Sequence, residues 1–353
     1  MPNRTRPALV AKADLPVRAF EIGGTLIPPG ERRSIDLPLA TLSTHTAVTL
    51  PMQVWHGRRA GPALFVCAAI HGDEILGLEI IRRLLRSQSL RHLRGTVVTI
   101  PIVNVFGFIA RSRYLPDRRD LNRCFPGRAA GSLGSRVAHQ FLSEVVARCT
   151  HGIDLHTGAV HRANFPQIRV NLDHAAAAVM ARDFAAPVTV NASLRDGSLR
   201  QAAHALGIAV IVYEAGEALR FDELAIRLGM RGVLGVLRGL GMLGATEKAR
   251  RMEAEPLIAR STSWVRAPVS GVFRPQVELG EWVVGDSVLG HVAGPFGDSE
   301  VAVRAPVNGI VIGRNHLPLV HEGNALYHIA QSEGTQVPAE LLDAFEDEEL
   351  VRA

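Results

Sequence analysis

The stretch 63-ALFVCAAIHGDEILGLEIIRRLL-85 decides the expected fold. Its first eight residues, Ala63 to Ile70, are apolar and have the length of a strand, which is typical of a strand buried within a sheet. From Ile75 to Leu85 the apolar residues recur at helical spacing, so that they form one stripe. A buried strand that leads directly into an amphipathic helix predicts an α/β sheet.

The same alternation continues along the chain on both sides of this stretch. Residues 1 to about 60 carry proline and glycine between short β-branched segments, which predicts strands and turns that flank the main sheet. Further strands are expected at Thr96 to Val103, His151 to Leu155 and Ile208 to Tyr213, and further helices at Ser135 to Val146 and Asp222 to Leu240. We therefore expect an α/β domain with a sheet flanked by helices.

A repeat marks the C-terminal part. The segment VRAPVSGVF at 265–273 recurs as VRAPVNGIV at 303–311, which predicts a quasi-symmetric β sandwich of the lipoyl or barrel-sandwich type. Such domains often carry a cofactor on a hairpin lysine, but no lysine follows Lys248. A cap that serves packing or oligomerisation is the favoured role. The expected organisation is a lead segment, an α/β domain, an unlipoylated β sandwich and an acidic tail, at 1–45, 46–250, 255–332 and 333–353.

Composition excludes several classes of protein. The net charge of +5 comes almost entirely from dispersed arginines, and aromatic residues make up 5%, so the basic stripe with interleaved aromatics of a nucleic-acid-binding protein is missing. No signal-like h-region or run of about 20 apolar residues predicts a membrane segment. The three cysteines form no CxxC pair, which favours a reducing, cytoplasmic location. Arginines that line a pocket for an anionic substrate are a secondary interpretation.

The first polar cluster, His71-Gly72-Asp73-Glu74, follows the strand of the opening stretch. His71 at the strand tip and Glu74 in the first helical turn can reach one ion, and Gly72 allows a tight turn between them. The alternative is that Asp73 and Glu74 are only acidic residues favoured at a helix N-terminus. Ligands of open α/β sheets bind at the carboxyl ends of the strands, so the other clusters are expected nearby.

The second polar cluster is Asp154-Leu155-His156-Thr157-Gly158. His156 offers a third ligand, and two histidines with one glutamate form a catalytic zinc set that leaves one position for water. A structural histidine is the alternative. Asp154 shares the face of His156 by strand alternation and could orient it.

Two further clusters complete the predicted site. The loop from Arg111 to Gly127 is dense in Asp, Asn and Arg, which suits carboxylate binding, although a solvated loop with internal salt bridges is the alternative. The last strand runs into Glu214, which is placed to act as a general base, whereas Glu217 is expected beyond the strand. Arg162, Asn164 and Arg169 could line the pocket or belong to an ordinary turn and strand.

Together the motifs H-G-D-E, D-L-N-R-x-F-P-G, D-L-H-T and E-x-G resemble the succinylglutamate desuccinylase/aspartoacylase family, which is related to the zinc carboxypeptidases. The match runs from about Pro51 to Gly244. The resemblance implies a zinc-carboxypeptidase-like mixed sheet followed by a small β module that narrows access to the metal. It also assigns residue roles: one zinc ion on His71, Glu74 and His156, the general base on Glu214, carbonyl polarisation on Arg113, and binding of the substrate carboxylate on Asn122 and Arg123.

The sequence therefore predicts a zinc-dependent amidohydrolase that removes an acyl group from a small carboxylate-bearing substrate, with no nucleic-acid or membrane partner. Water attacks an amide carbonyl and Glu214 receives its proton. The alternatives are an N-acetyl-diamino-acid deacetylase or an esterase with the same site, then a metallocarboxypeptidase, and outside the enzymes a ligand-binding module on a retired hydrolase fold. The sequence leaves a homo-oligomer open.

Overall fold

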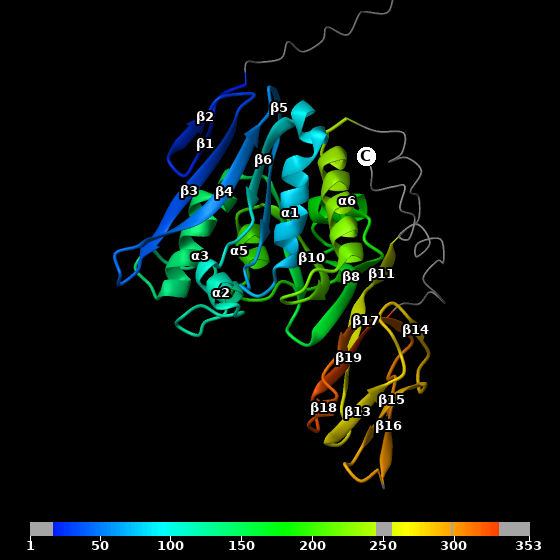
Figure 1. The fold of residues 1–353 in the computed structure, drawn as a ribbon. Coiled ribbons are helices and arrows are strands. Elements are labelled where there is room, and N and C mark those ends of the chain that lie inside the picture. Colours follow the sequence, from blue (N-terminus) through cyan, green and yellow to red (C-terminus); the bar gives the residue numbers. More distant parts are fainter. Residues whose placement is uncertain (1–16, 245–255, 298, 332–353) are drawn as a thin grey trace, which may run out of the picture.

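The computed structural model describes residues 17–244, 256–297 and 299–331 of the chain. The predicted acidic tail at 333–353, the first sixteen residues of the lead segment and Lys248 lie outside the described residues. Figure 1 shows a large α/β part and, beside it, a smaller part built from the C-terminal strands. The helices are α1 (Leu76–Arg86), α2 (Val105–Ala110), α3 (Leu133–Glu144), α4 (Ala175–Phe184), α5 (Leu199–Ala205) and α6 (Glu223–Gly239), with short 3-10 turns at Gln88–His92, Leu121–Arg123 and Val146–Arg148.

Four parallel strands form the centre of the main sheet. They are β5 (Arg59–Ala68), β6 (Arg94–Ile100), β7 (His151–Gly158) and β10 (Ala209–Glu217), and they lie in the order β10-β7-β5-β6. Each neighbouring pair is parallel, so their carboxyl ends meet at one edge of the sheet. These are the strands that the apolar runs predict.

Antiparallel strands extend this centre on both sides. On the β6 side lie β4 (Ala47–His56) and β3 (Arg32–Thr41), and on the β10 side lies β8 (Arg162–Val170), which also pairs with β9 (Val188–Asn191). The sheet is therefore mixed, as predicted. A hairpin of β1 (Phe20–Ile22) and β2 (Thr25–Ile27) buries Ile22 and Ile27 in the same core as α3.

Helices cover both faces of the sheet, because each presents one apolar stripe. Helices α1, α4 and α6 share one core with one face of the central strands, while α3 and α5 belong to the core on the opposite face. In α1 the residues Leu76, Ile80 and Leu84 are fully buried. Full burial of one such side chain contributes roughly 1.5–3 kcal/mol. The helix at Glu223–Gly239 begins after Asp222, whose side chain accepts a hydrogen bond from the Ala225 amide and so caps the helix. No helix within the described residues is long and apolar enough to cross a membrane.

The C-terminal strands form a β part that is continuous with the main sheet. An antiparallel sheet has the order β16-β15-β13-β18, while β12, β19 and β17 run on from β8 and so join the main sheet. The strands are β11 (Leu257–Ala259), β12 (Ser261–Arg266), β13 (Gly271–Pro275), β14 (Trp282–Val283), β15 (Val288–Ala293), β16 (Glu300–Arg304), β17 (Gly309–Asn315), β18 (Leu319–Val320) and β19 (Ala325–Gln331). The predicted fold class is confirmed.

An apolar cluster joins the two parts. It combines Val188 and Val190 of β9 with Ile310 and Ile312 of β17, all buried. Strand β11 also pairs with β9, and β17 pairs with β8. The β part is therefore held in place by both a shared sheet and a shared core, which fixes its inner strands beside the carboxyl ends of β7 and β10.

Two strands run further than the sequence suggests. Strand β7 continues through His156 to Gly158, so this histidine lies inside a strand and not at its end. The expectation that Glu217 lies beyond the last strand is wrong, because β10 shifts its register after Glu214 and pairs again at Glu217 with Gly158. Because the residues at these positions are polar, a prediction based on apolar runs ends both strands too early.

Candidate active site

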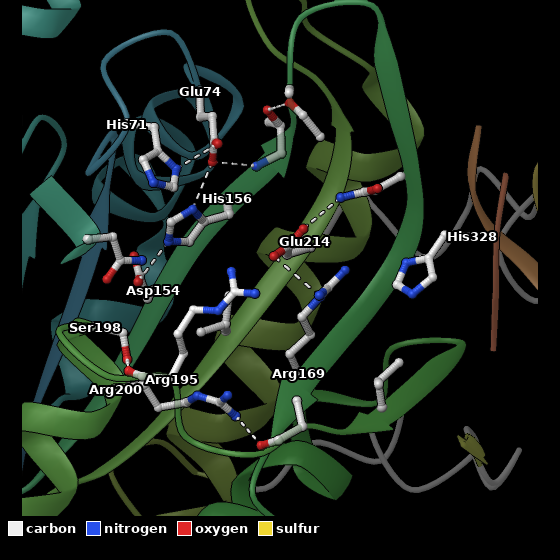
Figure 2. A pocket seen from close by; sticks show the side chains of 18 of the residues that line it. His71, Glu74, Asp154, His156, Arg169, Arg195, Ser198, Arg200, Glu214 and His328 are labelled. Atoms are coloured by element: carbon white, nitrogen blue, oxygen red, sulfur yellow. Dashed lines mark hydrogen bonds and ion pairs between the residues drawn. The ribbon is translucent and has the colours of Figure 1, made fainter. Parts of the chain in front are cut away.

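A pocket of about 520 Å³ opens where the carboxyl ends of the parallel strands meet the β part. Figure 2 shows His71, Glu74 and His156 at one end of this pocket and His328 at the other, with Glu214 and Arg169 between them. The lining comes from the predicted clusters, from the segment between β9 and α5, and from strands β12 and β19. The distant clusters of the sequence therefore converge on one site.

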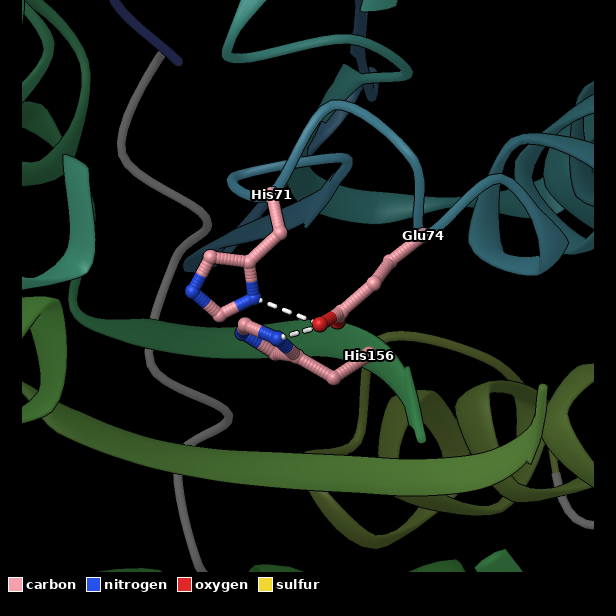
Figure 3. A group of neighbouring side chains, drawn as sticks. All are labelled: His71, Glu74 and His156. Carbon is pink, nitrogen blue, oxygen red and sulfur yellow. Dashed lines mark hydrogen bonds and ion pairs between the residues drawn. The ribbon is translucent and has the colours of Figure 1, made fainter. Parts of the chain in front are cut away.

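His71, Glu74 and His156 form a compact buried trio. One ligand atom from each residue lies within 4.8 Å of the others. The Nδ1 atoms of His71 and His156 each lie 2.7 Å from a different oxygen of Glu74, and Figure 3 shows both rings turned toward this carboxylate. Two imidazole nitrogens and one carboxylate are the donor set of a catalytic zinc site. The residues therefore fit a divalent metal.

Gly72 is needed for a different reason than a tight turn. A Cβ atom at Gly72 would lie 2.0 Å from the carbonyl carbon of Gly107 in α2. No side chain fits in that space, so α2 packs directly on the backbone between His71 and Glu74. The glycine thus serves close packing of the turn that carries two of the three candidate ligands.

A second carboxylate holds each histidine ring from its far side. His71 Nε2 lies 3.1 Å from Asp120, and His156 Nε2 lies 2.8 Å from Asp154. Such contacts fix the orientation of a metal-binding ring and increase its basicity. The contact of Asp154 agrees with the strand alternation. The part played by Asp120 was missed, because nothing in the sequence pairs this loop residue with His71.

The charges of this cluster reinforce one another. Burial would raise the pKa of Glu74, but His71 and His156 hold it below its usual value. Burial would lower the pKa of His71, but Glu74 and Asp120 raise it. The pKa of His156 also ends above its usual value, because Asp154 and Glu74 outweigh burial. The Glu74 carboxylate is therefore ionised, and a metal ion bound to the trio would take the place of the protons that the two rings hold.

Arg113 lies directly beside the trio. Its guanidinium donates to Glu74 over 3.0 Å and to Asp120 over 2.9 Å. Burial lowers the pKa of Arg113, but these two carboxylates raise it above its usual value. Held at two points, the guanidinium brings a fixed positive charge to the edge of the metal set.

Glu214 lies on the strand next to His156. The two residues are register partners on β10 and β7, so their side chains stand on the same face of the sheet. Asn164 donates its amide to Glu214 over 2.6 Å, and Arg169 Nε lies 3.3 Å from the other carboxylate oxygen. Its side chain is 19% exposed. Glu214 is therefore fixed beside the trio and still accessible from the pocket.

Asn122 and Arg123 lie in the 3-10 turn Leu121–Arg123, and both line the pocket. The side-chain oxygen of Asn122 accepts a hydrogen bond of 2.9 Å from the Leu199 amide, at the start of α5. Burial, together with the charges of Arg195 and Arg113, lowers the pKa of Arg123. All seven predicted site residues thus reach the same pocket.

Arg162, Asn164 and Arg169, left undecided above, line the pocket. The structure adds residues that the sequence did not indicate: Trp264 and His328 from the β part, Arg195 and Ser198 from the segment before α5, and Arg200 from the first turn of α5. Burial and Arg169 lower the pKa of Arg200 to about 10. No spacing in the sequence marks Trp264 and His328, because strand pairing between remote segments, such as β17 with β8, brings the β part to the site.

Comparison with known proteins gives a consistent result. Residues 60–240 match the model of the succinylglutamate desuccinylase/aspartoacylase catalytic domain. The chain is 25% identical over 313 residues to the N-alpha-acetyl-L-2,4-diaminobutyric acid deacetylase of Halomonas elongata. This alignment covers 81% of this chain and 86% of the relative.

Solved structures show the same fold. A succinylglutamate desuccinylase/aspartoacylase from Rhodobacter sphaeroides superposes with a TM-score of 0.76 at 25% identity, over 86% of this chain and 95% of that one. The product-bound ectoine utilization protein EutE (DoeB) from Ruegeria pomeroyi superposes with a TM-score of 0.77 at 24% identity, over 85% and 95% of the two chains.

The family match spans more than half of the chain and contains the trio, the arginine loop and Glu214. It confirms the predicted resemblance and the predicted class of enzyme, a hydrolase of the deacylase type. The chain belongs to the succinylglutamate desuccinylase/aspartoacylase family.

Proposed function

We propose that this chain is a zinc-dependent deacylase that hydrolyses the amide bond of a small N-acyl amino acid. The observation that carries the proposal is the meeting of His71, Glu74 and His156 within 4.8 Å in a pocket that Glu214 and Arg113 also line. In this proposal the trio holds one zinc ion and leaves a position open for water. A zinc ion bound there would supply Lewis acidity and lower the pKa of water in that position.

The surrounding residues then divide the work of amide hydrolysis. Glu214 takes a proton from the attacking water and gives it to the departing amine, as a general base and then a general acid. Asn164 and Arg169 keep its carboxylate in place through the contacts of 2.6 and 3.3 Å. Arg113 offers a positive charge to the carbonyl oxygen as negative charge develops on it. The products are a carboxylate and a free amine.

Asn122 and Arg123 bind the carboxylate of the substrate's amino-acid moiety in this proposal. The Leu199 amide occupies the side-chain oxygen of Asn122, so its NH2 group is the end that can donate to a substrate carboxylate. A guanidinium next to it suits the same planar group. The pocket volume of about 520 Å³ suits a small molecule, and the wall of Trp264 and His328 disfavours the long substrates of a carboxypeptidase.

A specific observation favours one alternative. The relative from Halomonas elongata is named for the removal of an acetyl group from a diamino acid, and it aligns over most of this chain. An N-acetyl diamino acid is therefore the second candidate substrate. A ligand-binding module without activity is less supported, because each proposed ligand and the proposed base are present in one pocket.

The purified protein, loaded with zinc, tests this proposal when it is given a panel of N-acyl amino acids. Glu214→Gln should retain its metal and lose turnover by roughly 10²–10⁴-fold, because only the proton-transfer group is removed. Glu217→Gln is the matched control, since this residue lies on the same strand but contacts His161 and His316 instead of the pocket.

Unimpaired turnover of Glu214→Gln would contradict the role of the base. A native protein that binds no metal and gains no activity when zinc is added would instead support the ligand-binding module. Metal content by mass spectrometry and amine release on the same samples distinguish these outcomes.

A further inference from the structure

Asn104 is a buried polar residue that the proposed mechanism does not use. It follows β6 as the N-cap of α2, and it is 0% exposed. Its backbone amide donates to the carbonyl of Ala69, two residues before His71, over 2.8 Å. A buried side-chain amide is costly unless its hydrogen bonds are made, so the partners of Asn104 indicate what the residue holds in place.

The oxygen end of the Asn104 amide holds the backbone of α2. Its Oδ1 atom accepts a hydrogen bond of 2.8 Å from the Gly107 amide, which is the usual contact of an N-cap residue. Gly107 is also the residue on which Gly72 packs. Gly72 lies between His71 and Glu74, which Figure 3 shows on one turn of the chain. Through Gly107, the oxygen of Asn104 therefore supports the turn that presents two candidate ligands.

The nitrogen end of the same amide contacts a different segment. Its Nδ2 atom donates to the backbone carbonyl of Arg113 over 3.4 Å. The two ends cannot be exchanged, because the Gly107 amide can only donate and the Arg113 carbonyl can only accept. One side chain thus binds α2 with its oxygen and the loop that carries Arg113 with its nitrogen.

Gly107 leaves the space in which this amide lies. A Cβ atom at Gly107 would lie 2.5 Å from the Asn104 Nδ2 atom and 2.7 Å from the Ser112 carbonyl oxygen. A side chain at this position would therefore displace the amide from the Arg113 carbonyl. The Ser112 amide in turn donates to the Gly107 carbonyl over 2.9 Å. The segment before Arg113 is thus packed on α2, and Asn104 extends this contact to Arg113 itself.

Arg113 is consequently fixed at both ends. Its guanidinium donates to Glu74 and Asp120, and its backbone carbonyl accepts from Asn104. A long side chain keeps its charged group in one place only when the backbone from which it extends is also fixed. The position matters for the rate, since a displacement of about 1 Å can cost about a hundredfold.

We propose that Asn104 is a positioning residue with two tasks. The nitrogen of its amide places Arg113 for polarisation of the substrate carbonyl, and the oxygen keeps the turn of His71 and Glu74 in the geometry that binds the metal. The first task rests on the proposed deacylase function. Asn104 is not among the residues that line the pocket, so it acts through these two segments and not by contact with the substrate.

Two substitutions separate the tasks. Asn104→Ser keeps an oxygen that can cap α2, because serine is as good an N-cap as asparagine, but it has no group that reaches Arg113. Asn104→Ala removes both contacts. The serine variant should keep the native zinc affinity and lose roughly ten- to a hundredfold in kcat, with KM changed by less than about threefold. The alanine variant should lose at least as much in kcat and bind zinc about tenfold more weakly.

The control for loss of a cap alone is Asp222→Ala. Asp222 caps α6 through a hydrogen bond of 2.9 Å from the Ala225 amide and does not line the pocket. This variant should unfold at a lower urea concentration than the native chain, yet keep its zinc affinity and kcat. Equal zinc affinities of the serine and alanine variants at position 104 would overturn the task assigned to the oxygen of Asn104.

A double-mutant cycle distinguishes the placing of Arg113 from general support of the fold. In an Arg113→Ala background, Asn104→Ser should change kcat by less than about twofold, because the group that Asn104 places is already absent. If the losses of kcat from the two substitutions instead multiply, Asn104 does not act through Arg113 and the first task is overturned.

Hydrogen exchange separates failure of this proposal from failure of the deacylase function. In Asn104→Ser the amides of residues 111–115 should exchange faster than in the native chain while those of α2 remain protected, and in Asn104→Ala both segments should exchange faster. If no N-acyl amino acid is hydrolysed yet exchange and zinc affinity change in this way, the proposed function fails and the placing of both segments by Asn104 stands. Unchanged exchange at 111–115 in the serine variant would overturn the placing of Arg113 whatever the activity.

Discussion

The two ends of the pocket differ in how their polar side chains are used. At the metal end, His71, His156 and Arg113 are bonded to the carboxylates around them at 2.7–3.1 Å. At the opposite end, where β8 meets the β part, the nitrogens of His328 and the Nε of Arg162 have no hydrogen-bond partner within the described chain.

We infer from this difference that the metal end carries out the reaction and that the other end recognises the substrate. Side chains that are hydrogen-bonded to one another keep their geometry before the substrate binds. The reaction therefore needs no free energy to reorganise them. Groups left without a partner gain their hydrogen bonds only when a ligand supplies them, so they discriminate between ligands. We therefore expect substitutions at the metal end to affect metal binding and turnover for every substrate, and substitutions at the other end to act on selectivity and stability.

The largest effect is expected from His156→Ala, which removes one candidate ligand. The variant should lose its bound metal and, with it, several kcal/mol of transition-state stabilisation, so kcat/KM should fall at least about a thousandfold. Metal content by mass spectrometry and amine release measure both losses. His321→Ala, on the exposed surface of the β part, should retain both metal and activity. A metal-loaded and active His156→Ala would remove this residue from the metal set.

A smaller effect is expected from Asp154→Asn, which keeps the shape of the side chain that orients His156 over 2.8 Å. Loss of the carboxylate charge should weaken metal affinity by roughly 10–100-fold, the usual cost of losing a residue that supports a ligand. Competition with a fluorescent zinc chelator measures the affinity. Asp286→Asn, in which the changed carboxylate is 86% exposed, should keep the native affinity. Equal affinities of the two variants would show that Asp154 does not support His156.

The residues of the metal end could be predicted from the sequence because each lies next to an apolar run that predicts a strand. His71 and Glu74 follow an apolar strand and precede a helical stripe, and His156 and Glu214 continue two further apolar runs. Parallel strands bring such segments to one edge whatever the details of the loops. The central strands and α1 could be predicted for the same reason.

The other end could not be predicted, because it depends on contacts between remote segments. His328 reaches the pocket only through the pairing of β19 with β17 and of β17 with β8, and no periodic pattern specifies which strands of two domains join. Asp120 is a similar case, since its contact with His71 depends on how a long loop folds back. The repeat 265–273/303–311 predicted a β sandwich correctly but carried no information on its position.

The pH dependence of the free energy of unfolding tests whether the ring nitrogens of His328 lack a hydrogen-bond partner. Burial, Arg169 and Arg162 lower its pKa to about 3 from a usual value of 6.5. Below pH 6.5 the unfolded chain therefore binds a proton at this residue that the folded chain does not, so stability falls as the pH decreases toward 3. Between pH 7 and pH 5 this loss amounts to about 2 kcal/mol.

In His328→Phe this part of the loss disappears. The free energy of unfolding, measured with urea at pH 7 and pH 5 on both proteins at the same metal content, should therefore decrease less in the variant than in the native chain. Identical decreases would mean that His328 has a protein or water partner that keeps its pKa near the usual value.

The smallest effect on zinc affinity is expected at Cys67, which contacts Asp154, the residue that orients His156. Its thiol donates to Asp154 over 3.4 Å, and burial together with Asp154 raises its pKa, so the proton stays in place. A thiol is a weak donor, so its contribution to zinc affinity should be less than about 1 kcal/mol. Cys67→Ser keeps a donor of similar size and Cys67→Ala removes it. Zinc should therefore bind the serine variant slightly more tightly than the alanine variant, by up to about fivefold. If the two variants bind zinc equally, the network that orients His156 ends at Asp154, because the thiol then contributes packing alone.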